Sequence, residues 1–325
     1  MLSRRSELAT LRQVATAALS RYPLAGGRLT FVGQVENTTF RHDGADGRHL
    51  VRVHRPQRHG RGVDSVAAIR SEIAWLQAIS QDTDLAVPQP LAACDGAPTV
   101  TVTVADKTRV CSVLRWMDGR IHEASPRPVH LARLGDVMAR LHIHADRWRP
   151  PTGFVRIRWD HDALFGNSMV YGETPAAECW DLLPGKVRAR FRAVEDRMVD
   201  LIPGADDAGL IHADLHLGNA LFHRGAVKLI DFDDCGTGPR LYDVAVALWA
   251  LRDRPDYPTF RDALLTGYRT RRDLDMTDLD HFIAARQVAF DLWYTGTAQV
   301  NTIFAGRLDN VHLGSMAMLD LLQAS

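Results

Sequence analysis

The segment IHADLHLGN, residues 211–219, places several polar side chains between hydrophobic runs. Asp214 and Asn219 are the residue types that phosphoryl transfer needs, because a carboxylate can orient an attacking hydroxyl and accept its proton, and an amide oxygen can bind Mg²⁺. A second carboxylate, Asp231, follows in VKLIDF. If NALFH and VKLIDF form a hairpin through the turn RGA, its open ends bring the three side chains together. The spacing therefore predicts a catalytic base beside a magnesium site.

The same segment permits a second chemistry. His212, Asp214 and His216 occupy alternate positions, so an extended backbone would turn all three to one side. Together with Asp231 they would form the ligand set of a hydrolytic metal site. A metal-dependent hydrolase is therefore the alternative to phosphoryl transfer.

A buried ion pair is predicted in the first third of the chain. The pattern of residues 64–80 predicts a helix with Asp64 as its N-cap, and Glu72 falls on the same face as the apolar residues. A carboxylate on a buried face needs a partner. In the strand HLVRVH, alternation puts Arg52 on the opposite side from its valine neighbours. We therefore expect Arg52 to pair with Glu72.

Two regions with different predicted secondary structure must position these groups. Alternation and turn signals predict five strands in the first region, at residues 28–34, 37–42, 48–54, 99–104 and 109–116. Helical patterns dominate the second, at residues 129–147, 175–201, 240–252, 258–272, 278–300 and 310–323. We expect an α+β fold with a small antiparallel-sheet lobe at residues 1–117, led by one helix, and a larger helical lobe at residues 118–325.

The composition narrows the functional classes. The chain has 325 residues, with 39 basic and 39 acidic side chains. Because nucleic-acid binding normally shows as a basic excess, no nucleic-acid partner is expected. The four cysteines form no C-x-x-C pair, and the longest strongly apolar run, VAVALWAL, is too short to span a bilayer. The first twenty residues lack the apolar core of a signal peptide. These features predict a cytoplasmic protein without a membrane segment.

The stretch IHADLHLGNALFHRGAVKLIDFDDCGTGPRLYDVAVAL resembles the core of the aminoglycoside phosphotransferase and choline kinase family. The segments VENTTFRH, HLVRVHRP, IRSEIAWLQAI and VLRWMDGR are similar to its stress-response kinase and homoserine kinase branch. The resemblance covers roughly residues 30 to 300. It implies a two-lobed protein-kinase-like fold, with ATP and Mg²⁺ as cofactors.

The resemblance also implies roles for particular residues of the helical lobe. Asp214 would be the catalytic base, and Asn219 and Asp231 would hold the magnesium ions. His212 would brace the loop, and His216 would lie near the phosphates. Further along the chain, Asp243 would tie its helix back to this loop.

In the first lobe, the resemblance places Arg52 where the family usually has a lysine that contacts the phosphates. Arginine is larger, forked and always charged, so this exchange is not conservative. Glu72 would position that cation. The backbone around Asn37 and Thr38 would cover the phosphates, and the hinge near Leu114 and Trp116 would meet adenine.

Six residues are candidates for the acceptor site: Asp233, Asp234, Trp159, Asp162, Asp291 and Trp293. Clustered acids with aromatic rings would suit an amino-bearing alcohol. The favoured function is an ATP-dependent O-kinase for a small molecule of the aminoglycoside, choline or homoserine kind, acting as a monomer or homodimer. A protein Ser/Thr kinase of the stress-response type, the metal-dependent hydrolase and a non-catalytic nucleotide-binding protein are the alternatives.

Overall fold

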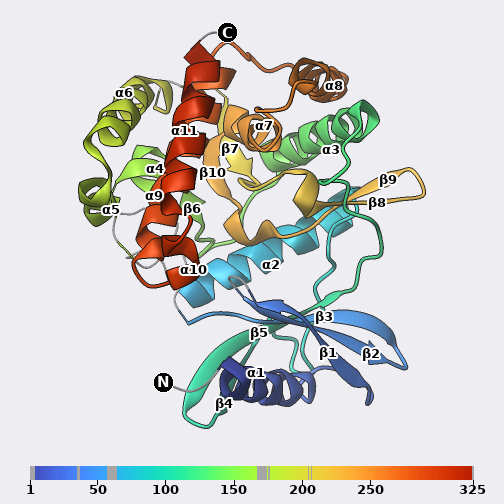
Figure 1. Ribbon diagram of the computed structural model, residues 1–325. Coiled ribbons are helices and arrows are strands. Elements are labelled where there is room, and N and C mark those ends of the chain that lie inside the picture. Colours follow the sequence, from blue (N-terminus) through green and yellow to red (C-terminus); the bar gives the residue numbers. More distant parts are fainter. Residues whose placement is uncertain are drawn as a thin grey trace. The chain divides into compact units, whose positions relative to one another are not determined.

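The structure, a computed structural model, describes residues 4–34, 37–56, 64–166, 174, 176–203, 205 and 207–323 (Figure 1). These residues form two compact units. Unit 1 comprises the described residues of Met1–Arg58, Asp64–Asp118 and Pro150–Val155. Unit 2 comprises those of Gly119–Arg149 and Arg156–Ser325. Each unit is described by its own contacts below.

Unit 1 is built on a five-stranded antiparallel sheet with the order β1-β2-β3-β5-β4. Its strands are β1 (Arg28–Gln34), β2 (Thr38–Gly44), β3 (Gly47–Val53), β4 (Val100–Val104) and β5 (Lys107–Arg115). All five strands were expected from the sequence. The two-residue turn between β4 and β5 places Ala105 and Asp106 at positive φ, the conformation whose twist matches that of a hairpin.

Two helices complete unit 1. Helix α1 (Arg4–Leu19) packs on the sheet, and its buried residues share a core with apolar residues of β2, β3 and β5. Helix α2 (Ser65–Asp82) begins where the side chain of Asp64 accepts hydrogen bonds from the N–H groups of Val66 and Ala67. The predicted N-cap is therefore confirmed.

Unit 2 consists mainly of helices. They are α3 (Pro128–Arg147), α4 (His161–Phe165), α5 (Ala176–Leu182), α6 (Gly185–Leu201), α7 (Arg240–Trp249), α8 (Tyr257–Arg269), α9 (Leu279–Ala298), α10 (Thr302–Ala305) and α11 (Leu308–Gln323). Helix α9 is apolar around most of its circumference because it contacts six other helices, α4, α5, α6, α7, α10 and α11. The prediction of one helix over residues 175–201 was wrong: the chain breaks into α5 and α6 at Pro184, which has no N–H to continue α5.

Short strands of unit 2 frame the polar loops. The predicted hairpin is present as β8 (Ala220–His223) and β9 (Ala226–Leu229), and it projects from the unit (Figure 1). A three-stranded sheet of β6 (Ile157–Arg158), β7 (Ala208–Ile211) and β10 (Gly236–Pro239) was not predicted. Unlike β8 and β9, which a short turn joins, these strands of two to four residues come from separate parts of the chain and carry no hairpin signal. Among the described residues, no helix is both long and apolar enough to cross a membrane.

Candidate active site

Strand register brings the two polar loops of unit 2 together. Ile211, at the end of β7, pairs with Gly236, at the start of β10. At the other side, Ala220 pairs with Leu229, and the N–H of Ile230 donates to the carbonyl of Asn219 at 3.0 Å. Asn219 therefore lies opposite the residue that precedes Asp231, as the predicted hairpin requires.

Asn219 is oriented by the carboxylate of Asp214. Its Nδ2 donates to Asp214 Oδ2 at 2.9 Å and to the Asp214 carbonyl at 2.8 Å. Because the amide nitrogen faces Asp214, the amide oxygen Oδ1 is turned to the other side. Asp231 adopts a left-handed backbone conformation with φ of 63°, and its side chain is exposed. An amide oxygen and an exposed carboxylate are hard oxygen donors of the kind that Mg²⁺ takes.

Charged neighbours hold Asp214 in its ionised form. Burial by itself would raise the pKa of this carboxyl, but the ring of His216, whose Nε2 lies 3.6 Å from Asp214 Oδ2, and the positive charge of Arg286 outweigh burial and hold the pKa below its usual value. Burial works in the opposite direction on His216, and the carboxylates of Asp214 and Glu123 outweigh it and raise the pKa of that ring. The site therefore contains an ionised carboxylate, as a general base requires.

Arg286 was missed by the sequence reasoning. It lies on α9, and its Nη2 donates to Asp214 Oδ1 at 2.8 Å. The side chain is only 10% exposed. The signal available was a single arginine within the apolar run IAARQVAF, since a buried guanidinium needs a partner. Sequence alone could not show that the partner is the predicted base.

His212 braces the loop and does not face a metal. Its Nε2 donates to the carbonyl of Ile230 at 3.0 Å, and its Nδ1 lies 3.4 Å from the backbone nitrogen of Asp214. The intervening Ala213 has a φ of 66°, so the segment is not extended and the expected one-sided alternation fails. In the described part of the chain, no three His, Cys, Asp or Glu side chains are placed to hold a metal ion. The ligand set of His212, Asp214 and His216 that the metal-dependent hydrolase alternative requires is therefore not formed by these described residues.

Asp243 fixes the turn that carries the loop. Its carboxylate accepts the N–H groups of His212 at 2.9 Å and Ala213 at 2.6 Å, and it also accepts Nε2–H of His142 at 2.9 Å. The other nitrogen of His142 accepts from the hydroxyl of Tyr268 at 2.8 Å. Burial lowers the pKa of His142 and leaves the ring neutral. This geometry supports the structural role expected for Asp243.

In unit 1, the predicted ion pair is present. Arg52 Nη1 donates to Glu72 Oε1 at 2.6 Å, and the two side chains are 4% and 0% exposed. Asn37 and Thr38 are buried, and the side-chain oxygen of Asn37 accepts the N–H of Arg55 at 3.3 Å. Whether these residues contact a nucleotide stays a prediction.

The segment expected to meet adenine ends strand β5. The side chain of Leu114 is fully buried and that of Trp116 is half-buried. The N–H of Trp116 donates to the carbonyl of Arg48 at 3.0 Å, so this donor already has a partner. Adenine would have to use another backbone group of the segment.

Two candidates for the acceptor site are buried and serve the fold. Trp159 is 1% exposed, and its indole N–H donates to the carbonyl of Asp234 at 2.8 Å. Asp291 is 0% exposed, and it accepts hydrogen bonds from Ser315 at 2.6 Å and His312 at 2.8 Å. Neither side chain offers a surface to a substrate, so the prediction that they contact the acceptor was wrong.

The four other candidates differ in exposure. Asp233 is 6% exposed, Asp234 and Trp293 are half-buried, and Asp162 is exposed. Trp293 belongs to a cluster of half-buried aromatic rings on α9 and α10. Its ring centroid lies 5.7 Å from the ring centroid of Phe290 and 5.7 Å from that of Phe304. These four residues stay candidates.

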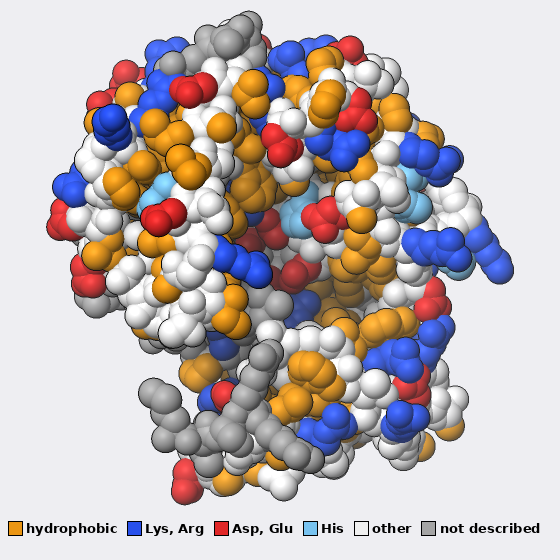
Figure 2. Space-filling model, in the orientation of Figure 1, with side chains coloured by type: hydrophobic (Ala, Val, Ile, Leu, Met, Phe, Trp, Pro, Cys, Tyr) orange, Lys and Arg blue, Asp and Glu red, His pale blue; other side chains and the backbone are white. Residues whose placement is uncertain are grey.

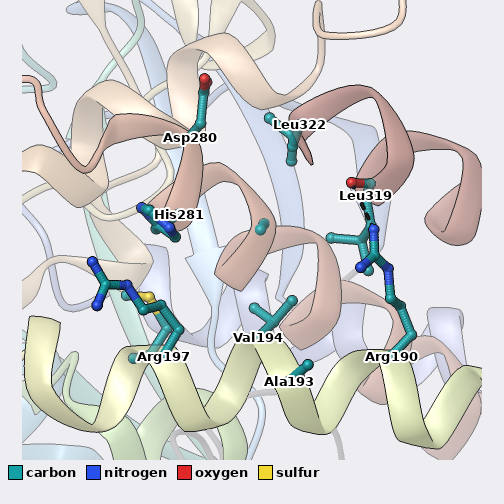
Figure 3. Close-up of a pocket in the computed structure, with 10 residues that line it drawn as sticks. Arg190, Ala193, Val194, Arg197, Asp280, His281, Leu319 and Leu322 are labelled. Carbon is teal, nitrogen blue, oxygen red and sulfur yellow. Dashed lines mark hydrogen bonds between the residues drawn. The ribbon is translucent and has the colours of Figure 1, made fainter. Parts of the chain in front are cut away.

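A separate cavity of about 360 Å³ lies between α6, α9 and α11. Figure 3 shows Arg197 and His281 on one side of it, and Arg190 on the other, bonded to the carbonyl of Leu319. The α9 residues that line it, such as His281, lie on the opposite face of that helix from Arg286. The cavity is therefore separate from the site formed by Asp214, Asn219 and Arg286.

The distribution of charged side chains on the surface agrees with the equal numbers of acidic and basic residues. On the face drawn in Figure 2, basic and acidic side chains are interspersed, which fits a formal net charge of +0.

Comparisons with known proteins agree on one family. A model described as the phosphotransferase enzyme family matches residues 28–279. An uncharacterized protein of Deinococcus radiodurans is 31% identical over 85% of this chain and 78% of its own length. A homoserine kinase of Rhodospirillum rubrum is 30% identical over 59% of this chain, and the matched region is 57% of that enzyme.

Solved structures show the same fold. A microcompartment-associated aminopropanol kinase is 28% identical, with a TM-score of 0.82 over 97% of this chain and 98% of that one. An amicoumacin kinase in complex with AMP-PNP is 20% identical, with a TM-score of 0.72 over 97% and 93% of the two chains.

Proposed function

Because the chain belongs to the phosphotransferase enzyme family and is an enzyme of the kinase type, we propose that it transfers the γ-phosphate of ATP to a hydroxyl group of a small molecule. The predicted family, the mixed α and β protein-kinase-like fold and the enzyme class are confirmed. The confirmed enzyme class removes the non-catalytic alternative. The cytoplasmic location, the boundary near residue 118 and the oligomeric state stay predictions.

The observation that carries the proposal is the arrangement of Asp214, Asn219 and Asp231. Asp214 is an ionised carboxylate with a fixed orientation. It would accept a hydrogen bond from the acceptor hydroxyl, align its oxygen with the γ-phosphorus, and take the proton as the new P–O bond forms. The phosphoryl group passes to the acceptor oxygen, and the bond between the γ-phosphorus and the oxygen of the ADP leaving group breaks.

Asn219 and Asp231 would hold magnesium. Their oxygens suit this hard cation, and Mg²⁺ takes few protein ligands when phosphates supply the others. When bound, it would offset the negative charge of the phosphates in the transition state. In unit 1, Glu72 would fix the guanidinium of Arg52, which would contact phosphate oxygens in a forked manner that lysine does not offer.

The acceptor is proposed to be a small amino-bearing alcohol. By their names, the aminopropanol kinase and the homoserine kinase act on molecules of this class. Among the described candidates, Asp234, Asp162 and Trp293 are exposed or half-buried, and they would recognise an ammonium group through charge and through an aromatic face. These relatives favour a small acceptor over a protein.

The first experiment is isothermal titration with ATP, with and without Mg²⁺, on the wild type and on Asp231→Asn. We expect binding that depends on magnesium in the wild type and is weakened in the variant, because one metal ligand loses its charge. Absence of ATP binding by folded wild type would contradict the proposal.

Turnover is then measured with aminopropanol, homoserine, choline and an aminoglycoside, using Asp214→Asn as the inactive control. Loss of the general base should lower kcat by roughly 10²–10⁴-fold. Turnover of a protein substrate alone would contradict the small-molecule acceptor.

A further inference from the structure

We infer that Arg286 is a positioning residue for the reaction: it fixes the carboxylate of Asp214 in the orientation that proton transfer requires. The inference rests on the proposed function, in which Asp214 is the base. Arg286 belongs to α9, a helix distant in sequence from the catalytic loop, and 72 residues separate the two partners.

Both carboxylate oxygens of Asp214 are held by donors from different elements. Arg286 Nη2 donates to Oδ1 at 2.8 Å, and Asn219 Nδ2 donates to Oδ2 at 2.9 Å. Asn219 and His216, whose Nε2 lies 3.6 Å from Oδ2, both contact that one oxygen, so without Arg286 the carboxylate could still turn about its side-chain torsions. The second contact, from a nearly buried arginine, removes that freedom.

Arg286 is itself held by the packing of unit 2. Its guanidinium carbon lies 5.1 Å from the ring centroid of Trp249, within cation–π range. The indole N–H of Trp249 donates to Gln287 Oε1 at 2.7 Å, and Gln287 Nε2 donates to Ser315 Oγ at 2.8 Å. Ser315 donates to Asp291 Oδ2 at 2.6 Å. A chain of contacts therefore runs from α11 through α9 and α7 to the base.

This series of contacts includes Asp291, whose buried side chain does not contact a substrate and supports the packing instead. Its buried carboxylate also lies 2.8 Å from His312 Nδ1, so it ties α11 to α9. Buried polar groups that are fully hydrogen-bonded make a rigid support. Precise placement of a reacting group matters because a misplacement of about 1 Å can cost on the order of 10²-fold in rate.

The test compares Arg286→Met, which keeps much of the volume, with Arg286→Lys, which keeps the charge. We expect kcat to fall by roughly 10²-fold in Arg286→Met, with the Kd for ATP and the KM for the acceptor unchanged. Arg286→Lys should recover part of kcat, because its ammonium can still reach Asp214 but lacks the planar guanidinium. In Arg286→Ala, added methylguanidine should restore part of kcat by filling the vacated space.

Two results would overturn the inference. One is a raised acceptor KM with an unchanged kcat, which would make Arg286 a substrate contact. The other is full activity of Arg286→Met. Thermal unfolding and ATP titration on each variant show whether it is folded, and methylguanidine rescue is measured on the same protein before and after addition.

Arg254→Met is the matched control, because Arg254 forms an ion pair with Asp256 at the surface and lies outside the chain of contacts. It should keep full activity. Asp214→Asn separates the two proposals. If Asp214→Asn keeps its activity, the proposed function fails; if it is inactive while Arg286→Met is not, only the role of Arg286 fails.

Discussion

Arg52 and Glu72 form an ion pair inside unit 1, with one partner on β3 and the other on α2. Burial of two charges costs free energy that their attraction repays only when the geometry is good. The N···O distance of 2.6 Å and the exposures of 4% and 0% meet that condition. A pair of this kind contributes little net stability, but loss of one partner is severe because the other is left buried and charged.

We therefore expect Glu72→Ala to lower the free energy of unfolding by roughly 3–5 kcal/mol. Urea denaturation of the wild type and the variant measures the difference. The double variant Arg52→Met, Glu72→Leu replaces both charges by apolar groups and should recover most of the stability. It should not recover the affinity for ATP, because the proposed phosphate contact is gone. Equal stability of Glu72→Ala and wild type would show that the pair is not buried.

At the scale of elements, α3 and α8 approach until their backbones touch. A Cβ added to Gly267 would lie 1.9 Å from the carbonyl oxygen of Ala132, and one added to Gly135 would lie 2.2 Å from that of Leu264. Such contact leaves no room for any side chain. It matters for the site because α3 carries His142 and α8 carries Tyr268, the two residues that support Asp243.

Gly267→Ala should therefore force α3 and α8 apart, although alanine is normally the better helix former. We expect a loss of about 1–3 kcal/mol in the free energy of unfolding, as for other overpacked sites. Gly314→Ala is the control, since a Cβ at this exposed position of α11 meets nothing within 4 Å. It should raise stability by roughly 0.5–1 kcal/mol. A gain of stability in Gly267→Ala would contradict the backbone contact.

On the scale of the whole molecule, unit 2 contains buried histidines that fold in the neutral form. His130 is 3% exposed, and its Nε2 lies 3.3 Å from Arg127 Nη2. Burial, followed by the charges of His122 and Arg127, lowers the pKa of His130 to about 4. Burial also lowers the pKa values of His142 and His212. Each ring binds a proton more readily in the unfolded chain, so acid favours unfolding.

The direction of the pKa shift of His130 determines the pH range over which this residue changes the stability of the fold. Its folded pKa of about 4 lies below the unfolded value of 6.5. Its contribution to stability is complete above pH 6.5, falls as the pH drops toward 4, and does not change further below that. His130→Gln, whose side chain does not titrate, should show a smaller loss of unfolding free energy between pH 7 and pH 5 than wild type. Guanidinium denaturation at the two pH values measures this, and identical losses would contradict the lowered pKa.

The sequence by itself determined the local structure and the chemistry of the loops. Alternation and the Asp64 cap were sufficient for the five strands of unit 1 and the start of α2, because these depend on neighbours along the chain. The spacing of Asn219 and Asp231 across a short hairpin was likewise a local property, and strand register confirmed it. Even the pairing of Arg52 with Glu72 followed from two periodicities and the cost of a buried charge.

Only the tertiary structure decided which distant groups meet. The pairing of Arg286 with Asp214 depends on where α9 packs, and no pattern within either segment encodes that placement. The positive φ of Ala213 depends on Asp243, 30 residues later, whose carboxylate accepts both N–H groups of the turn. That turn removed the metal-binding alternative, and burial removed Trp159 and Asp291 from the acceptor site. Burial and long-range hydrogen bonding are properties of the packed chain, whereas periodicity records only the face on which a residue lies.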